Sequence, residues 1–357
     1  MKVLVAGCGS IGRRHALNAS ALGAQVALCD PLTARLQEFA QAHGFKECFA
    51  DLQEAVAVAR PDAAIVASPT HCHLEQALLL ARQGVHILME KPLAHTLAGL
   101  AELEQVVAGR RLTFMMAQCQ RFHEGFLALK KLLDEQRIGQ VWHVEITNGW
   151  FLPDWHYKED YRQEYAAQRK MGGGVLLTNL SHLFDTIHWL FGEIIEVRGW
   201  KTQLSDLALD VEDFAACLLR TKRNIFVTVV DDFLARAPHG EVRVNGTEGF
   251  VVFNLRQNSL ACWTVKDRRF LPGDARATEP GRKVICVLEN GIGYDMQPLT
   301  ATVPFETNHR YRAELAHFLE LVARRETCFE LDLRTGVRVM NQLLSPEMAW
   351  KTRVDGN

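Results

Sequence analysis

The chain has 357 residues, a length that suits two domains better than one. Its hydrophobic content of 48% and charged content of 23% are typical of a soluble globular protein. The net charge of −2, with no basic block, gives no electrostatic support for binding nucleic acid or an anionic membrane, and no apolar run approaches the roughly 20 residues of a membrane span.

The cysteines and the start of the sequence indicate a cytoplasmic protein. There are nine cysteines, an odd number, and they lack C-x-x-C spacing, which favours reduced thiols. The sequence begins with a strand-like run, so we expect no signal peptide. His71-Cys72-His73 resembles a metal motif, but neighbouring residues rarely point at one ion, so we predict no metal site.

The first residues form a strand, a glycine-rich turn and a helix. Residues 2–6 are an apolar run too short for a helix, and Gly7, Gly9 and Gly12 follow in the spacing G-x-G-x-x-G. Gly7 permits the tight turn, and Gly9 lets a pyrophosphate approach the backbone. Gly12 lets the helix at 13–22 pack on the strand, and the free N–H groups of that helix can hold phosphates.

A second strand, at 25–29, ends at Asp30, 18 residues after the last of these glycines. An acid there can accept hydrogen bonds from the adenosine ribose and repels a 2′-phosphate, so the pattern predicts NAD. Arg13, Arg14 and Arg35 lie near enough in the sequence to keep NADP as an alternative.

Strands and helices continue to alternate through residue 121. The further strands are predicted at 45–49, 63–67, 85–89 and 112–117. Further helices are predicted at 32–43, 71–83 and 96–108. A short helix is also predicted to begin at the Asp51-x-x-Glu54 capping box. This alternation predicts a doubly wound parallel sheet over residues 1–121, with ligands at the carboxyl ends of its strands.

Polar residues follow the last three of these strands. They are Ser68, Pro69, Thr70 and His73 after the fourth strand, Glu90 and Lys91 after the fifth, and Gln118 and Gln120 after the sixth. A lysine at a strand tip can point its ammonium at a substrate or a nicotinamide, whereas a solvated lysine is the ordinary alternative. The position of Lys91 between an acid and a rigid proline favours the functional interpretation.

From residue 122 the pattern changes to strands without helices between them. After a helix at 124–136, strands are predicted at 140–151, 196–204, 212–220, 224–233, 240–246, 249–254 and 259–266. Asn245 to Gly249 predicts a hairpin, and 267–307 is the least regular stretch. We therefore predict an α+β domain over residues 122–357 with a large open, mostly antiparallel sheet.

One face of this sheet is expected to be covered by helices at 175–191, 309–325 and 333–349. The other face is expected to be buried in a homodimer or homotetramer.

His182 lies on the predicted helix at 175–191, after Gly172-Gly173-Gly174. An imidazole titrates near neutral pH, so it can take the proton of an alcohol, and Asp185 or Asn179 is a candidate to hold its tautomer. Spacing alone favours a packed helix histidine.

Aromatic and basic residues suggest a carbohydrate site. Trp155 and Tyr161 are candidates to stack on the C–H faces of a sugar, although packing of their loop is an equal alternative. Arg121 and Arg162 are candidates to bind a carboxylate or phosphate.

The chain resembles the glucose–fructose oxidoreductase / inositol dehydrogenase / MocA (Gfo/Idh/MocA) family of NAD(P)-dependent oxidoreductases over nearly its whole length. The residues that carry the resemblance are Gly7-Cys8-Gly9-Ser10-Ile11-Gly12, Ser68-Pro69-Thr70-His71-Cys72-His73, Glu90-Lys91-Pro92, Gln120-Arg121-Phe122 and Gly172-Gly173-Gly174 through His182 to Asp185. The family implies a Rossmann domain, a second domain with an open antiparallel sheet, and dimers or tetramers. It also implies that Lys91 is the active-site lysine and His182 the catalytic histidine.

The predicted site residues fall into two groups. Cofactor contacts are predicted for Gly7, Gly9, Ser10, Ile11, Gly12, Arg13, Asp30, Ser68, Pro69, Thr70, His73, Glu90, Lys91 and Gln120. Substrate contacts are predicted for Lys91, Arg121, Trp155, Tyr161, Arg162, Thr178, Asn179 and His182.

The chain departs from the family at one place. Many members carry an aspartate three or four residues before the histidine, where this chain has Asn179 and Thr178. A weaker base, a different substrate class and a loss of catalysis are all consistent with this change. The residues at 151–156 and 160–162 resemble a subgroup often encoded among surface-sugar and nonulosonate biosynthesis enzymes.

We therefore predict an NAD-dependent oxidoreductase that acts on a secondary alcohol or ketone of a sugar, sugar acid or nucleotide sugar. His182 would take up the hydroxyl proton, and Lys91 would stabilise the developing alkoxide. The alternatives are an NAD-binding regulator or scaffold without turnover, and a glycosidase that oxidises and re-reduces its substrate transiently.

Overall fold

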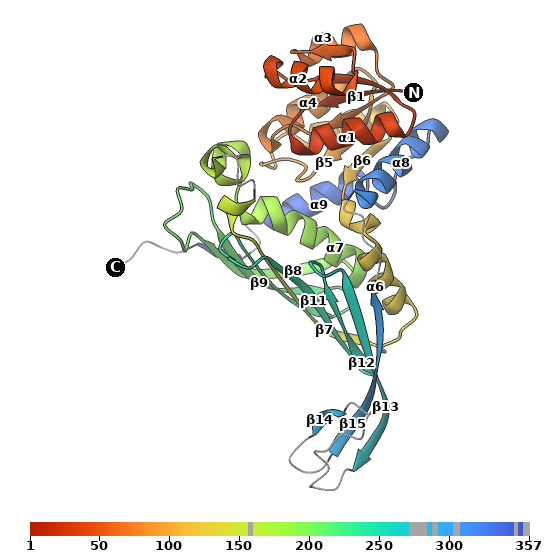
Figure 1. Ribbon diagram of the computed structural model, residues 1–357, viewed down its shortest axis with the longest axis vertical. Helices are drawn as coiled ribbons and strands as arrows, with labels where there is room; N and C mark the ends of the chain where they lie inside the picture. Colours follow the sequence, from red (N-terminus) through yellow and green to blue (C-terminus); the bar gives the residue numbers. More distant parts are fainter. Residues whose placement is uncertain (156–159, 271–283, 288–291, 303–307, 346–348, 353–357) are drawn as a thin grey trace.

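The computed structural model describes residues 1–155, 160–270, 284–287, 292–302, 308–345 and 349–352. They form two sheets with helices packed between and around them (Figure 1). A six-stranded parallel sheet contains the N-terminus, and a ten-stranded, mostly antiparallel sheet lies beyond it. None of the described helices has the length and apolarity needed to cross a lipid bilayer.

The parallel sheet has the strand order β3-β2-β1-β4-β5-β6. Its strands are β1 (Lys2–Ala6), β2 (Gln25–Cys29), β3 (Glu47–Phe49), β4 (Ala63–Val66), β5 (His86–Glu90) and β6 (Phe114–Ala117). Its helices are α1 (Ser10–Ala21), α2 (Thr33–His43), α3 (Leu52–Ala59), α4 (Thr70–Arg82) and α5 (Leu100–Gly109). The order reverses between β1 and β4, which places the ligand crevice at the ends of these two strands. The predicted doubly wound sheet is confirmed.

The large sheet has the order β14-β15-β13-β12-β11-β7-β10-β9-β8-β16. Its strands are β7 (Val141–Gly149), β8 (Ile194–Thr202), β9 (Phe214–Thr221), β10 (Phe226–Asp232), β11 (His239–Gly246), β12 (Gly249–Asn254), β13 (Ser259–Phe270), β14 (Val284–Val287), β15 (Ile292–Thr302) and β16 (Ala349–Thr352). Among the described strands of this sheet, only the pairs β7–β10 and β8–β16 are parallel, so the predicted mostly antiparallel sheet is confirmed. The predicted hairpin joins β11 and β12, with Gly246 opposite Gly249.

The remaining helices lie between the sheets or beside the first one. They are η1 (Cys119–Phe122), α6 (Glu124–Asp134), the π-helical turn η6 (Leu176–Leu180), α7 (Ser181–Phe191), α8 (His309–Arg324) and α9 (Leu333–Leu344). Helices α6, α7 and α9 lie on the side of the large sheet that faces the parallel sheet (Figure 1). Their apolar side chains join the two sheets in one continuous buried core.

Helix α8 corrects one prediction. We expected residues 309–325 to cover the large sheet, but Leu315 and Phe318 pack in a second core against Val3 and Val5 of the parallel sheet. The chain therefore returns to the first sheet after building the second. The predicted division at residues 121 and 122 stays a prediction.

Three further boundaries were wrong. We expected 267–307 to be the least regular stretch, and no strand was predicted there, but residues 292–302 pair with β13; Pro298 weakens a strand pattern read from local sequence alone. Residues 271–283, 288–291 and 303–307 of this stretch lie outside the described part of the chain. Helix α9 ends at Leu344, before Ser345-Pro346, rather than at 349, since the residue before a proline disfavours helix. Helix α5 begins at Leu100 rather than at Thr96.

Candidate active site

The glycine-rich turn after β1 requires two of its glycines for packing. Gly7 has φ +99°, and a Cβ there would lie 2.6 Å from the carbonyl oxygen of Ala67. A Cβ on Gly12 would lie 1.8 Å from the carbonyl oxygen of Gly7. A Cβ on Gly9 would meet nothing within 4 Å, so the space in front of the turn is open at the start of α1. This arrangement fits a bound pyrophosphate.

Asp30 is held rigidly beside this turn. Its Oδ2 accepts hydrogen bonds from the backbone N–H of Cys8 (2.7 Å) and from Nη2 of Arg35 (2.8 Å), and its Oδ1 accepts one from the N–H of Leu32 (2.9 Å). Asp30 is 2% exposed. Arg13 donates from Nε to the carbonyl of Cys8 (3.1 Å), so it fixes the turn from the other side.

The tips of β4 and β5 are tied together by His73. Its Nδ1 lies 2.8 Å from the carbonyl oxygen of Pro92, and its Nε2 lies 2.8 Å from that of Ser68. Glu90 is paired with Nε2 of His15 on α1 at 2.8 Å. These side chains are buried and position the loops around the crevice.

Four other predicted cofactor residues lie at the same edge. Ser10 and Ile11 are in the first turn of α1, Pro69 is the N-cap of α4, and Thr70 is its first residue. Gln120 instead accepts a hydrogen bond from the hydroxyl of Thr186 (2.7 Å).

Lys91 joins the two parts of the chain. Its Nζ donates to the carbonyl oxygen of Thr178 at 2.8 Å, which places the β5 tip against the π-helical turn η6. The hydroxyl Oγ1 of Thr178 is buried and has no hydrogen-bond partner among the described residues. A π-helical turn widens the helix locally, and such turns are frequent at functional sites.

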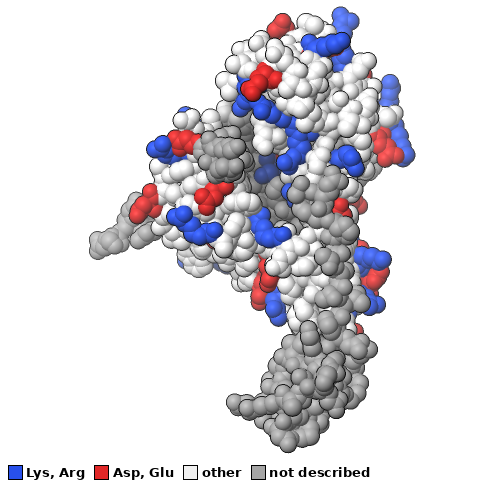
Figure 2. All heavy atoms as spheres, viewed as in Figure 1, with Lys and Arg blue, Asp and Glu red and all other residues white. Residues whose placement is uncertain are grey.

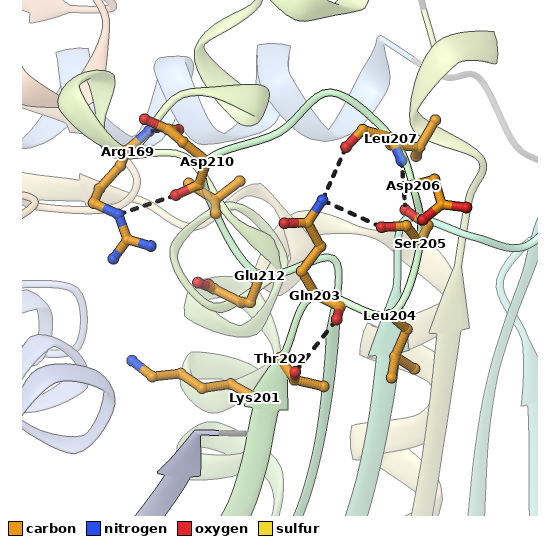
Figure 3. A pocket seen from close by; sticks show the side chains of 11 residues that line it. Arg169, Lys201, Thr202, Gln203, Leu204, Ser205, Asp206, Leu207, Asp210 and Glu212 are labelled. Carbon is orange, nitrogen blue, oxygen red and sulfur yellow. Dashed lines mark hydrogen bonds between the residues drawn. The ribbon is translucent and has the colours of Figure 1, made fainter. Parts of the chain in front are cut away.

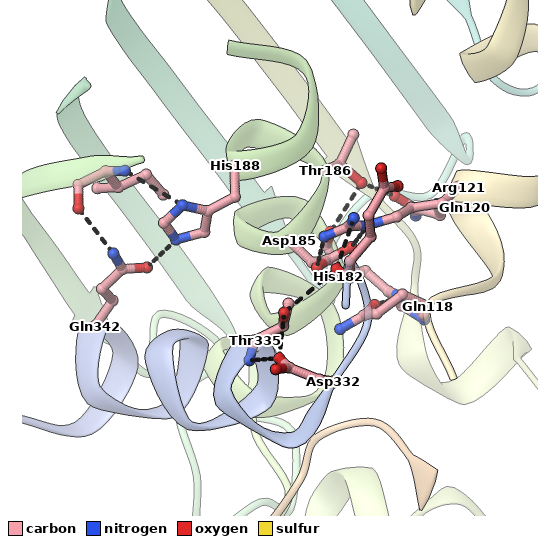
Figure 4. Close-up of polar contacts among 12 residues, drawn as sticks. Gln118, Gln120, Arg121, His182, Asp185, Thr186, His188, Asp332, Thr335 and Gln342 are labelled. Carbon is pink, nitrogen blue, oxygen red and sulfur yellow. Dashed lines mark hydrogen bonds and ion pairs between the residues drawn. The ribbon is translucent and has the colours of Figure 1, made fainter. Parts of the chain in front are cut away.

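His182 lies in the first turn of α7, which directly follows the π-helical turn, and its Nδ1 lies 3.0 Å from Oε1 of Gln118 (Figure 4). Because an amide oxygen only accepts, Nδ1 carries the hydrogen and Nε2 keeps its lone pair. Burial, together with the positive charges of Lys91 and Arg310, holds the pKa of His182 well below its usual value. The imidazole is therefore neutral and has a free basic nitrogen.

Asp185 does not serve as the partner of His182. Its carboxylate accepts Nε and Nη2 of Arg121 at 2.8 and 2.6 Å, and both side chains are buried (Figure 4). Arg121 also donates to the carbonyl of Glu330 at 3.1 Å. Because the N–H donors of Arg121 point at these oxygens, the geometry does not support its predicted contact with the substrate.

Asn179 also turns away from His182. Its Nδ2 donates to Oδ1 of Asp231 at 2.7 Å, and Nδ2 of Asn148 donates to the other oxygen at 2.9 Å. Asp231 is completely buried, and burial raises its pKa to about 8 although the two amide donors favour the charged form. Positions 178 and 179 lack the family's aspartate, but Asp231 on β10 places a carboxyl group next to Asn179.

The residues predicted to bind a carbohydrate contact other parts of the chain than Lys91 and His182. Trp155 packs on Phe233 with ring centroids 5.9 Å apart, and the hydroxyl of Tyr161 accepts the N–H of Ala208 at 3.2 Å. Arg162 is exposed and pairs with Asp160 at 2.7 Å. Residues 156–159 lie outside the described part of the chain.

A hollow of about 820 Å³ opens between the 169–171 turn and the loop after β8 (Figure 3). Its lining contains none of the predicted cofactor or substrate residues. Glu212 lines the hollow, and its carboxylate accepts the N–H of Leu176 at 3.1 Å. This contact caps the start of the helix that carries Thr178 and His182.

Comparisons with known proteins agree with this geometry. Residues 1–118 match the model of an oxidoreductase family with an NAD-binding Rossmann fold, and residues 126–252 match the GFO/IDH/MocA C-terminal domain. Together these matches cover more than half of the chain. The chain belongs to the GFO/IDH/MocA family of oxidoreductases.

Relatives and solved structures within this family span the chain. It is 25% identical to an inositol 2-dehydrogenase of Rhizobium meliloti (strain 1021), over 89% of this chain and 87% of the relative. It is 27% identical to a myo-inositol 2-dehydrogenase of Thermotoga maritima, over 73% of this chain and 77% of the relative.

The fold is similar to that of a levoglucosan dehydrogenase in complex with NADH, with TM-score 0.78, 19% identity and coverage of 95% and 94%. It is also similar to the WlbA dehydrogenase from Bordetella pertussis in complex with NADH and UDP-GlcNAcA, with TM-score 0.72, 20% identity and coverage of 96% and 94%.

As a member of this family, the chain is an NAD(P)-dependent oxidoreductase of CH–OH groups. The open turn at Gly9 and the fixed carboxylate of Asp30 fit an NAD molecule, which supplies the hydride acceptor when bound. No group of three or more described His, Cys, Asp or Glu residues is placed to hold a metal ion.

Sequence reasoning assigned no role to several residues of this site. Gln118 carried a signal, because it follows a strand of the parallel sheet, but nothing local joined it to His182. Asp231 and Arg310 carried none, since one lies in an ordinary strand pattern and the other at the start of a distant helix.

Proposed function

We propose that this protein transfers a hydride between NAD and a secondary alcohol or ketone of a sugar, sugar acid or nucleotide sugar. The observation that carries the proposal is the contact between Lys91 Nζ and the Thr178 carbonyl, which brings the lysine to the turn preceding a neutral His182. The named relatives, which include inositol dehydrogenases, support a polyol or sugar substrate.

The proposed roles follow from the protonation states. In the oxidation direction, Nε2 of His182 would take up the hydroxyl proton as the C–O bond becomes a carbonyl. Bound NAD would supply the acceptor for the hydride that leaves the same carbon, so atoms and charge balance. Lys91 would stabilise the negative charge that develops on the oxygen, and Gln118 would hold the tautomer.

The test measures NADH at 340 nm with purified protein and a panel of polyols, sugars, sugar acids and nucleotide sugars. We expect Lys91→Ala and His182→Ala each to lower kcat about 10²- to 10⁴-fold, since each removes a group that acts in the transition state. Lys130→Ala is the matched control, because the Lys130 side chain is one-third exposed on α6 and its one ion pair among the described residues is with Asp134.

The alternatives make different predictions. A regulator or scaffold would bind NADH but turn over no compound, and Lys91→Ala would leave its biological effect intact. A transient oxidation would give product without net NADH, so products are also analysed by mass spectrometry. Turnover within threefold of wild type in both Lys91→Ala and His182→Ala would contradict the proposed mechanism.

We also propose that the helix-free face of the large sheet forms a homodimer or homotetramer in the cytoplasm. Trp200, Leu218 and Phe226 are 57, 44 and 41% exposed, and they alternate along their strands with residues buried in the core beneath the helices, so they lie on this face. The eight described cysteines are free thiols, which suits a reducing compartment. Light scattering on wild type and on Leu218→Glu tests the assembly, and a monomeric wild type would contradict it.

A further inference from the structure

Arg310, at the start of α8, has no anionic partner among the described residues. Its Nη2 donates to the hydroxyl of the adjacent Tyr311 at 3.1 Å, and its guanidinium lies 4.9 Å from the centroid of that ring. Its Nε is buried and has no hydrogen-bond partner, and none of the described carboxylates forms an ion pair with Arg310. A buried guanidinium donor without an acceptor is costly, so a ligand is expected to supply one.

The charge of Arg310 acts on the candidate active site. Together with Lys91 it lowers the pKa of His182, and it also lowers the pKa of Arg256, after the larger effect of burial in both cases. Arg256 stacks on Trp150 at 4.4 Å and donates only to neutral oxygens, those of Asn148 and His239, at 3.4 Å. Figure 2 shows Lys and Arg atoms gathered in the hollow between the upper and lower parts of the molecule.

Nearby acids do not cancel this positive charge. Neither carboxyl oxygen of Glu314 has a hydrogen-bond partner among the described residues, and burial raises the pKa of this group well above its usual value. Burial also raises the pKa of Asp231 to about 8. Glu90 is paired with His15, and Asp185 with Arg121.

The two arginines that the sequence analysis named as candidates for anion binding already have carboxylate partners, unlike Arg310. Arg121 is bound by Asp185, and Arg162 is exposed and bound by Asp160. Arg310 is the described arginine that combines a buried unpaired donor with a direct electrostatic effect on His182.

We infer that Arg310 binds an anionic oxygen group of the substrate, so that the enzyme acts on an acidic sugar. The guanidinium fork matches a carboxylate or a phosphate, which the test below distinguishes as a sugar acid or a sugar nucleotide. This inference rests on the proposed function, because it names the substrate class of the same site.

A bound anion would also make His182 a stronger base. Its negative charge would offset Arg310 and Lys91, and the pKa of His182 would rise on binding. The enzyme would then abstract a proton well only from substrates that carry the anion, which makes Arg310 a determinant of specificity.

The experiment compares matched pairs: D-glucuronate with D-glucose, and UDP-N-acetylglucosamine with N-acetylglucosamine. Initial rates at 340 nm with saturating NAD give kcat/KM for wild type, Arg310→Met, Arg310→Lys and the control Arg324→Met, whose arginine is exposed on the same helix. We expect wild type to favour the anionic member of at least one pair about tenfold or more. Arg310→Met should remove most of this advantage, Arg310→Lys should restore part of it, and KM for NAD should stay within twofold.

The pair that shows the advantage identifies a carboxylate or a diphosphate as the group bound. Rising salt should increase KM for the anionic sugar of wild type but not for its neutral partner, a readout that needs no variant to fold. The absence of any anionic advantage, or an Arg310→Met effect on KM for NAD instead of on the sugar, would overturn the inference.

Failure of the proposed function can be distinguished from failure of this inference. If no sugar is oxidised, calorimetric titration of the same four compounds into the NADH complex still compares their binding. An anionic preference that Arg310→Met removes would support the inference even then, and equal binding or no binding of all four would reject it.

Discussion

The imidazole Nδ1 of His182 lies 3.0 Å from the amide oxygen of Gln118, a residue 64 positions earlier in the chain. One residue belongs to a helix over the large sheet and the other follows the last strand of the parallel sheet. The hydrogen bond therefore joins the two halves of the crevice and fixes which nitrogen can act as a base.

We expect Gln118→Leu to lower kcat/KM at least about tenfold, because the ring loses the acceptor that selects its tautomer. Gln118→Glu keeps an acceptor and adds a negative charge, which raises the pKa of His182. The acidic limb of its pH–rate profile should therefore move to higher pH. The profiles of both variants are compared with that of Gln257→Leu, which changes an exposed glutamine. Wild-type rates in Gln118→Leu would contradict the role.

The buried pair of Arg121 and Asp185 ties η1 to α7. Removing one partner leaves an uncompensated charge inside the protein, so we expect Asp185→Ala to lower the free energy of unfolding by about 3–5 kcal/mol. The exposed pair of Lys130 and Asp134 should contribute about 0.5 kcal/mol by comparison, because solvent screens it.

Urea titrations monitored by circular dichroism measure both effects. The double variant Arg121→Met with Asp185→Leu should be less destabilised than the sum of the single variants, since no buried charge remains unpaired. A strictly additive result would show that the two side chains do not act as a pair.

The first sheet was predictable because its information is local. Each strand is a short apolar run, and the turn between Gly7 and Gly12 carries its own steric requirements. The β11–β12 hairpin was predictable for the same reason. By contrast, β15 contains Pro298 and is a strand only through its pairing with β13, and α8 turns back to the first sheet because Leu315 and Phe318 match that core.

The candidate site shows the same limit. Lys91 and His182 could be named from sequence, one from its place at a strand tip and both from family motifs. Their neighbours could not, because Gln118, Asp231 and Arg310 reach them from other elements. The expected tautomer partner Asp185 lies one helical turn along but faces Arg121, and a charge pair in a buried site outweighs a neutral contact.

Asp231 should make stability depend on pH. Its pKa is raised by burial to about 8, whereas an unfolded aspartate titrates near about 3.9. Between these values the folded protein holds a proton that the unfolded chain has lost, so stability falls as pH rises through this window. At about 1.4 kcal/mol per unit of pKa difference, the loss amounts to several kcal/mol as an upper bound.

Asp231→Asn removes this titration while keeping a group that can bond to Asn148 and Asn179. We expect it to gain thermal stability relative to wild type at pH 8 and to show little difference near pH 4 to 5. Thermal unfolding across pH 4–8.5, with the exposed Asp134→Asn as control, measures the difference. A constant difference across this range would show that Asp231 is already ionised at low pH.

Asp30 and Arg35 should together set the cofactor preference. The carboxylate of Asp30 repels a 2′-phosphate and also holds the guanidinium of Arg35 at 2.8 Å. Asp30→Ala removes the repulsion and releases Arg35, whose side chain is 41% exposed, to meet that phosphate. We expect the ratio of NAD to NADP affinity to fall about tenfold or more, as measured by NADH and NADPH fluorescence titration.

Adding Arg35→Met to Asp30→Ala separates the two effects. If Arg35 binds the phosphate, the double variant should lose much of the gained NADPH affinity while NADH affinity changes little. Asp30→Asn keeps an acceptor for the N–H of Cys8 and so controls for a displaced turn. An unchanged affinity ratio in Asp30→Ala would remove Asp30 from cofactor selection, and equal NADPH binding by the single and double variants would remove Arg35.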